Sequence, residues 1–224
     1  MFLHSSSFTP IELEPVMVDG RRLYPTPSGG KYPSITTVLG VCPKKKASLA
    51  KWKERVGKDK AQAISNRAAT RGTNFHSIVE NYLNNCYNEE EHKSSPLPLL
   101  MFKNAVPTLN RINKVYLQEA ALYSDHLEIA GRVDCIGEFD GIPSIIDFKT
   151  SAEEKREEWM EDYYIQETGY GCMFYELYNT RIKQLVTIVA CEDGNTQVVI
   201  KNPKKEYLER LIYLRSLYEE VYGG

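Results

Sequence analysis

The chain has 224 residues, of which 42% are hydrophobic and 26% charged, with a formal net charge of −2. This length suits one domain with a proper core, and the mean hydropathy of −0.43 with no long apolar run predicts no membrane span. The 5 cysteines are odd in number and scattered without a C-x-x-C pair, which argues against a disulfide framework, a zinc site or an iron–sulfur cluster.

The N-terminal segment, residues 1–30, is expected to form an arm with a small hairpin at Asp19-Gly20, and residues 31–224 to form a single domain. The first residues include acidic side chains and no early arginine, so neither a transit peptide nor a secretory signal is expected. A cytoplasmic protein of a bacterium or a phage-infected cell fits this start. Residues 28–32 lack the spacing and ending of a phosphate-binding loop, so no built-in ATPase motor is expected.

Residues 44–60 carry eight basic side chains against two acidic ones, whereas residues 153–162 carry six acidic against two basic. A basic segment that contains Trp52 could hold phosphates and stack a base, which suits single strands. A solvated lysine-rich helix is the open alternative. The candidate nucleic-acid-binding residues are Lys51, Trp52, Lys53, Arg55, Arg67 and Arg71.

A helix is expected over residues 62–84, with apolar positions close to helical spacing. Gly72, His76 and Glu80 lie four residues apart and share another stripe of this helix. Glycine in a helix interior costs about 1 kcal/mol, so a close approach of the backbone to something is indicated. A partly buried polar histidine without a functional role is the alternative.

The remaining elements alternate between helices and strands. A polar, mobile loop is expected at 85–97 and a helix at 97–115, kinked or split by Pro107. Strands are expected at 116–124, 128–139, 143–150, 184–191 and 196–201, and further helices at 162–178 and 203–222. The prediction is an α/β domain with a small mixed β-sheet flanked by helices.

Two of these strands form a hairpin that brings two acids together. Asp140-Gly141 is a typical two-residue turn, and a hairpin closed there places Asp134 directly opposite Asp147, with Cβ atoms about 5 Å apart. Lys149 points to the same face as Asp147. Facing carboxylates repel unless a cation lies between them, and Mg²⁺ is the natural occupant. A surface hairpin with unrelated charges is the alternative, and a register slip of one residue would separate the acids.

In the helix at 162–178, Gln166 and Tyr170 are four residues apart and share a face. Taken alone, they make an ordinary polar and aromatic helix face.

Together these motifs resemble the RecB-like branch of the PD-(D/E)xK nucleases, over about residues 34–178. The order of that family appears here as Gly72/His76, Asp134, Asp147-Phe148-Lys149 and Gln166/Tyr170. Residues 34–39 and 52–55 are also similar to the mitochondrial genome maintenance exonuclease subgroup. The first acid is preceded by Val133 rather than proline, which leaves the chemistry unchanged.

The resemblance implies a restriction-endonuclease-like core and a role for each motif residue. His76, Asp134, Asp147 and the backbone carbonyl of Phe148 would hold Mg²⁺ or Mn²⁺, and Glu80 is a candidate further ligand or orienting group. Lys149 would position the attacking water and offset charge on the phosphate. Gln166 and Tyr170 would orient the nucleic-acid backbone.

The expected activity is a metal-dependent DNA exonuclease that prefers single-stranded DNA or single-stranded ends, in replication, recombination or repair. A partner protein from those processes is a further expectation. A structure-specific or sequence-specific endonuclease on the same core is the first alternative, and a non-catalytic nucleic-acid-binding module is the second. The need for a free DNA end separates the first two, and loss of activity in EDTA excludes the third.

Overall fold

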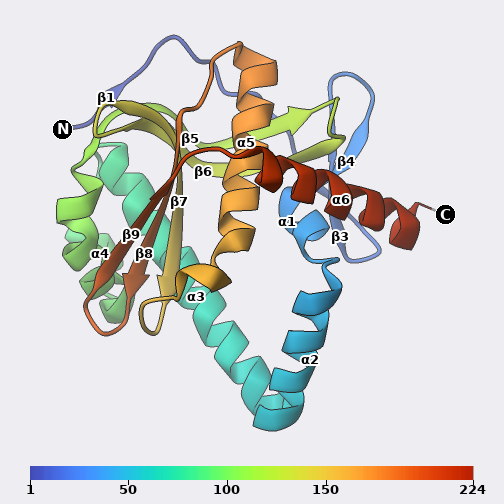
Figure 1. The fold of residues 1–224 in the computed structure, drawn as a ribbon. Coiled ribbons are helices and arrows are strands. Elements are labelled where there is room, and N and C mark those ends of the chain that lie inside the picture. The colour runs from blue at the N-terminus through green and yellow to red at the C-terminus, as the bar shows by residue number, and fades with distance from the viewer. Residues whose placement is uncertain (224) are drawn as a thin grey trace.

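A six-stranded mixed sheet, in the order β1-β5-β6-β7-β8-β9, lies at the centre of the computed structural model, which describes residues 1–223 (Figure 1). β1 runs parallel to β5 and β7 parallel to β8, while the other neighbours are antiparallel. The predicted mixed sheet flanked by helices is confirmed. The strands are β1 (Leu3–His4), β5 (Ile112–Ser124), β6 (Ile129–Phe139), β7 (Ile142–Ser151), β8 (Gln184–Cys191) and β9 (Thr196–Lys201).

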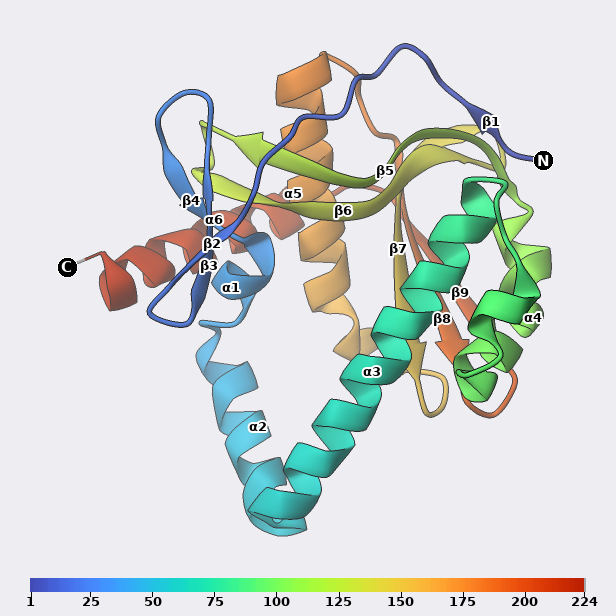
Figure 2. The same ribbon diagram turned by 180° about the vertical axis from the view of Figure 1, so that it is seen from behind.

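Helices cover both faces of the sheet (Figures 1 and 2). One face packs against α1 (Ile35–Leu39), α5 (Glu161–Tyr178) and α6 (Lys205–Tyr222), and the other against α3 (Lys58–Leu83) and α4 (Pro96–Leu109). Successive side chains of a strand point to opposite faces, so β7 gives Ile145 to the first core and Ile146 to the second. Within residues 1–223, no helix combines the length and apolar character that a membrane span requires.

The β6–β7 hairpin has the predicted register. Asp140 and Gly141 both have positive φ, 52° and 77°, as a two-residue hairpin turn of the primed type requires. The pairing runs from Phe139↔Ile142 to Cys135↔Ile146. Beyond this pair the two strands separate, and β7 continues beside β8. Asp134 and Asp147 are therefore the first residues past the end of the paired region.

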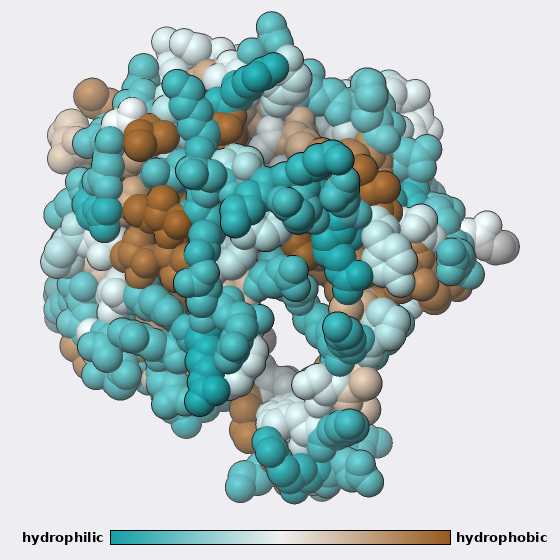
Figure 3. All heavy atoms as spheres, in the orientation of Figure 1, coloured by the Kyte–Doolittle hydropathy of each residue, from teal (hydrophilic) through white to brown (hydrophobic). Residues whose placement is uncertain are grey.

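A helical arm projects from the body, formed by α2 (Pro43–Val56) and the first half of α3 (Figures 1 and 2). Gly57 joins the two helices with φ of 90°, a conformation that favours glycine. The space-filling view shows an opening between this arm and the body (Figure 3). The basic residues of segment 44–60 belong to the arm, in α2 and the first turn of α3.

The N-terminal hairpin is present as β2 (Val16–Val18) and β3 (Arg21–Pro25), which pair across Asp19-Gly20. β4 (Lys31–Pro33) adds a third strand, and Leu3 and His4 of β1 pair with the main sheet. The division of the chain into an arm, residues 1–30, and a single domain, residues 31–224, stays a prediction.

Two expected boundaries were wrong. The helix expected to reach residue 115 ends at Leu109, and β5 begins at Ile112 because Ile112 pairs with Phe139 of β6. Pairing with the sheet therefore outweighs the helical continuation beyond Pro107. The expected loop at 85–97 contains a short 3₁₀ helix, Glu89–His92.

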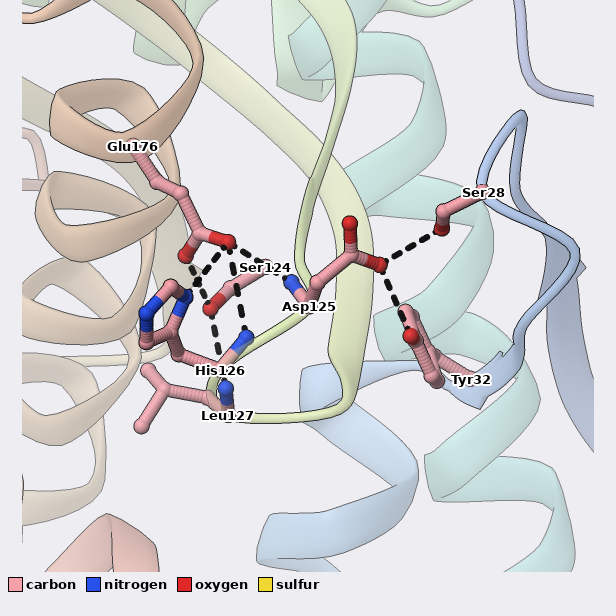
Figure 4. A network of polar contacts seen from close by, with 7 residues as sticks. All are labelled: Ser28, Tyr32, Ser124, Asp125, His126, Leu127 and Glu176. Atoms are coloured by element: carbon pink, nitrogen blue, oxygen red, sulfur yellow. Dashed lines mark hydrogen bonds and ion pairs between the residues drawn. The ribbon is translucent and has the colours of Figure 1, made fainter.

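A carboxylate of α5 holds the turn between β5 and β6 (Figure 4). Glu176 accepts hydrogen bonds from the Ser124 hydroxyl (2.5 Å), the Asp125 amide (2.9 Å) and the His126 ring (3.1 Å). Asp125 in turn accepts from the Ser28 hydroxyl, which ties the turn to the loop before β4. Burial opposes ionisation of Glu176, but these hydrogen bonds outweigh it and lower the pKa of the carboxyl.

Glu176→Ala is expected to reduce the free energy of unfolding by about 2 kcal/mol at neutral pH, because it removes hydrogen bonds to a charged group. A carboxyl with a lowered pKa stabilises the folded state above its unfolded pKa, and this contribution disappears as the pH falls through the folded pKa. Urea denaturation at neutral pH and at about pH 3 should show the difference from wild type shrinking in acid. Glu90→Ala, which removes only an exposed pair with Lys93, is the control; equal losses in both variants would contradict the prediction.

Candidate active site

The two hairpin acids lie where β6 and β7 separate. The Phe148 amide donates to Oδ2 of Asp134 at 2.9 Å, which holds the first acid against the second strand. Asp147 follows two isoleucines that are buried in opposite cores, and its side chain is 3% exposed against 15% for Asp134. The apolar sequence around Asp147 thus places a carboxylate in the protein interior.

Lys149 neutralises the buried acid. Its Nζ forms an ion pair with Oδ2 of Asp147 and lies 5.2 Å from the centre of the Tyr163 ring. Burial raises the pKa of the Asp147 carboxyl, and the nearby Lys149 opposes this shift. Burial lowers the pKa of Lys149, but Asp147 and Asp134 outweigh it and raise that pKa above its usual range. Lys149 therefore remains an ammonium at neutral pH and is suited to stabilise negative charge rather than to accept a proton.

His76, on α3, contacts the other side of the same strand. Its Nε2 donates to the Phe148 carbonyl at 2.8 Å, and its Nδ1 lies 3.8 Å from both Glu119 and Asp134. Burial lowers the pKa of His76, but the nearby carboxylates of Glu119 and Asp134 outweigh it and raise the pKa to about 9. Coordination of a metal by Nδ1 therefore requires a proton to leave.

The sequence analysis missed Glu119. Glu119 lies on β5 between the pairs Gln118↔Cys135 and Ala120↔Val133, so it is opposite Asp134. Its φ is 45°, which an extended glutamate rarely adopts. The sequence offered one sign of this residue, a carboxylate inside a largely apolar strand. The register of that strand with β6, which places Glu119 opposite Asp134, could not be predicted from residue spacing.

These groups fit a hard divalent cation. Among residues 1–223, His76, Glu119 and Asp134 offer ligand atoms that all lie within 4.8 Å of one another. Two carboxylates and one imidazole suit Mg²⁺ or Mn²⁺. The predicted ligand roles of Asp147 and of the Phe148 carbonyl stay predictions, because Asp147 faces Lys149 and the carbonyl accepts from His76.

Glu80 lies one helical turn after His76 on α3. Burial raises the pKa of its carboxyl, and the charge of Glu119 adds to the shift. Its carboxyl therefore lies close enough to Glu119 to belong to the same acidic cluster. The predicted role of Glu80, as a further ligand or an orienting residue, stays a prediction.

Tyr170 and Gln166 support the hairpin from α5. The Tyr170 hydroxyl donates to the Arg132 carbonyl at 2.7 Å, and a Cβ at Gly131 would lie 2.9 Å from that hydroxyl. Glycine at 131 thus permits the contact, which fixes the backbone two residues before Asp134. Gln166 lies beside the same hydroxyl. The structure gives Tyr170 a positioning role, and the predicted contact of both residues with nucleic acid stays a prediction.

Glu167 is a second residue that the sequence analysis missed. It is fully buried, and its Oε1 accepts from the hydroxyl of Thr187, the β8 residue that pairs with Asp147. Burial raises the pKa of Glu167 well above its ordinary value, and the charge of Asp147 adds to the shift. The core beside Asp147 therefore favours the neutral form of this acid.

Arg67 and Arg71, two of the predicted nucleic-acid-binding residues, lie on α3 and form contacts within the protein. Arg71 forms an ion pair with Glu192 and donates to the Thr150 hydroxyl at 3.1 Å, while Arg67 lies 3.2 Å from Glu192 and its side chain is 70% exposed.

A Cβ at Gly72 would meet only the Thr150 hydroxyl, at 3.8 Å, among the described residues. The expected close approach to Gly72 is therefore absent within this part of the protein.

Four basic residues of α2 border a groove of about 1350 Å³ between the arm and the body. Lys51, Trp52 and Arg55 line it, whereas Lys53 lies beside a different hollow near Gly57. A separate cavity of about 470 Å³, at the other end of α5, is lined largely by apolar side chains and includes none of the acids of the candidate active site.

Comparison with known proteins supports the predicted resemblance. No profile of a protein family matches the chain. Over 132 residues it is 29% identical to mitochondrial genome maintenance exonuclease 1 of Mus musculus, covering 55% of this chain and 38% of that protein. The Homo sapiens protein of the same name is 26% identical over 174 residues, covering 73% of this chain and 50% of the relative. The chain resembles this nuclease family.

The chain thus spans half or less of the length of these relatives. A crystal structure of a candidate exonuclease from Eubacterium rectale has a TM-score of 0.48 and 10% identity, covering 67% of this chain and 65% of that one. The resemblance predicted from the order of the motifs is confirmed by the two named exonucleases, which support a nuclease function.

Glu167→Gln is expected to gain stability relative to wild type as the pH rises from about 4.5 to about 8. A raised pKa means that the folded state holds this proton more tightly than the unfolded chain, so wild type loses stability as the pH rises toward the folded pKa. Glutamine keeps the neutral shape and has no such proton to lose. Thermal unfolding across this range measures the effect.

Glu167→Ala serves as the control, because it lacks the same proton but leaves Thr187 without its partner, so it should lie about 2 kcal/mol below the glutamine variant at every pH in this range. A glutamine variant whose stability falls in parallel with wild type at every pH would show that Glu167 is ionised in the folded protein.

Proposed function

We propose that the chain is a metal-dependent deoxyribonuclease that removes nucleotides from DNA ends. The observation that carries this proposal is the convergence of two acids, a histidine and a lysine around one peptide, Phe148, at the end of the β6–β7 pairing. The names of the two relatives add the exonuclease activity.

Each residue of the site has a distinct task in hydrolysis. His76, Glu119 and Asp134 would hold Mg²⁺ or Mn²⁺, with Asp147 available beside them. The bound cation would polarise the scissile phosphate and lower the pKa of a bound water. The Lys149 ammonium orients the attacking water and offsets the charge that develops on the phosphate.

The arm supports a requirement for a free end. Both ends of the arm join the body through the chain, and an opening lies between arm and body (Figure 3). A strand that passes through an opening bounded on all sides by the folded chain has to enter by its end, which an exonuclease substrate provides. Basic side chains and Trp52 on α2 favour a single strand over a duplex. The proposed setting is DNA replication, recombination or repair in the cytoplasm of a bacterium or phage-infected cell.

An endonuclease on the same core would cut circular DNA, and a binding module would cut nothing. A digestion series with end-labelled linear and circular single strands, linear duplex and RNA, each with and without EDTA, separates these functions and tests the proposal. Hydrolysis confined to linear DNA and abolished by EDTA is the expected result.

Asp134→Ala, Asp147→Ala and Lys149→Ala are each expected to reduce cleavage by at least about a hundredfold, since each removes charge stabilisation at the phosphate or its cation. Asp134→Ala should also weaken Mn²⁺ binding, measured by calorimetry, whereas Lys149→Ala should largely spare it. Lys103→Ala, on α4 beside an exposed glutamate, is the control. A cleavage rate of Asp147→Ala close to that of wild type would contradict the nuclease assignment.

Linear single-stranded DNA is expected to be digested faster than blunt duplex, and circular single strands are expected to survive. Binding should weaken steeply as salt is added, because lysines on the arm displace counterions from phosphates. Gel analysis of products over time measures both. Rapid digestion of blunt duplex with single strands left intact would favour a duplex-end processing enzyme.

A further inference from the structure

The chain has 2 tryptophans, and both border the groove between the arm and the body. Trp52 comes from α2 on the arm, and Trp159 comes from the 3₁₀ helix Glu157–Trp159 that precedes α5. Trp159 is 67% exposed, which is unusual for so large an apolar side chain. Tyr213 of α6 lines the same groove and is 51% exposed.

Two arginines lie against these exposed rings. The guanidinium carbon of Arg156 is 5.2 Å from the Trp159 ring centre, and that of Arg210 is 5.0 Å from the Tyr213 ring centre. Each pair presents a flat aromatic surface next to a permanent positive charge. Such pairs offer a stacking surface to a base and a counter-charge to its phosphate.

The acidic side chains of the groove are largely matched by basic ones. Asp162 forms an ion pair with Lys45 at 2.8 Å, which joins α5 to α2, and Glu158 lies 3.8 Å from Arg156. Glu161 lines the groove as the third acid. The basic residues in the lining are Lys44, Lys45, Lys51, Arg55 and Arg210. The excess of basic groups suits a polyanion.

We propose that this groove is a second binding site, for a single-stranded segment of nucleic acid, in which Trp159 and Trp52 stack on bases from the two sides. The occupant is single-stranded because a duplex keeps the faces of its bases covered by their neighbours. This inference rests on the proposed nuclease function and names the part of the substrate that lies outside the catalytic centre.

Helix α5 connects the groove to the catalytic residues. Glu161 and Asp162 line the groove from its first turn, and Gln166 lies one turn further, about 6 Å along the helix axis. Tyr163, between them, contacts Lys149 through its ring. A strand held in the groove therefore lies next to the phosphate site. Trp159 would determine the affinity for the substrate rather than the rate of the chemical step.

Intrinsic tryptophan fluorescence reports this groove alone, because both tryptophans border it. An oligothymidylate titrated into the full chain, with EDTA present to block hydrolysis, is expected to quench the emission. Trp159→Ala should weaken binding about tenfold or more, as loss of one stacked base does, and Trp159→Phe should weaken it less. Circular dichroism checks that both variants fold.

Tyr175→Ala is the matched control, since Tyr175 is an exposed ring on the same helix beneath Arg181 and outside the groove. It should bind oligothymidylate like wild type. An unchanged emission on binding, or equal affinity of Trp159→Ala and wild type, overturns the groove site, and equal quenching by blunt duplex overturns its preference for single strands.

The two proposals fail in different ways. Hydrolysis of linear DNA without quenching leaves the nuclease function standing and removes the groove site. Quenching by oligothymidylate that Trp159→Ala abolishes, in a protein that hydrolyses no substrate with Mg²⁺ or Mn²⁺, supports the groove site and removes the nuclease function.

Discussion

The peptide group of Phe148 is the contact on which the candidate site depends. Its amide holds Asp134 of β6, and its carbonyl holds His76 of α3. One residue of β7 thus joins two further elements, and its neighbours in sequence are Asp147 and Lys149. Hydrogen bonds to charged groups in a partly buried position contribute about 1.5–3 kcal/mol each, so these contacts can order the side chains before any cation or substrate arrives.

The electrostatic consequence is a cluster of acidic side chains whose charge is only partly compensated. Glu80, Glu119 and Asp134 surround His76, while Lys149 compensates Asp147. The raised pKa of His76 shows that, in this arrangement, a proton supplies part of the missing positive charge. Such a site favours a divalent cation because exchanging one proton for two positive charges relieves the repulsion between carboxylates.

Local sequence rules predicted the hairpin because its turn and its apolar alternation agree. Asp140-Gly141 has the required positive φ values, and Pro143 is accommodated opposite Glu138 without shifting the register. The other side of the site was not predictable in this way. Pairing of β5 with β6 shifts register before Leu117, so the position of Glu119 depends on an irregularity that residue spacing does not encode.

Tertiary contacts decided the remaining differences. The helix that ends at Leu109 does so because the following residues gain partners in the sheet. The hydroxyl of Tyr170 donates to the Arg132 carbonyl, a contact that the sequence did not indicate. The groove lies between segments more than 100 residues apart in sequence, Lys45 and Asp162 among them, so only the folded arrangement shows that the two tryptophans share it. The motif order, by contrast, needs no tertiary information, and it gave the correct resemblance.

The separation of charge between arm and body has an electrical consequence for how the molecule meets its substrate. Residues 44–60 hold eight basic and two acidic side chains, which leaves 20 basic and 28 acidic side chains in the rest of the chain. A positive projection on a negative body is a dipole directed along the arm (Figure 1). In the field of a polyanion such a molecule rotates until the arm leads, so productive orientation precedes contact, and the association rate depends on ionic strength even though the net charge of the protein is negative.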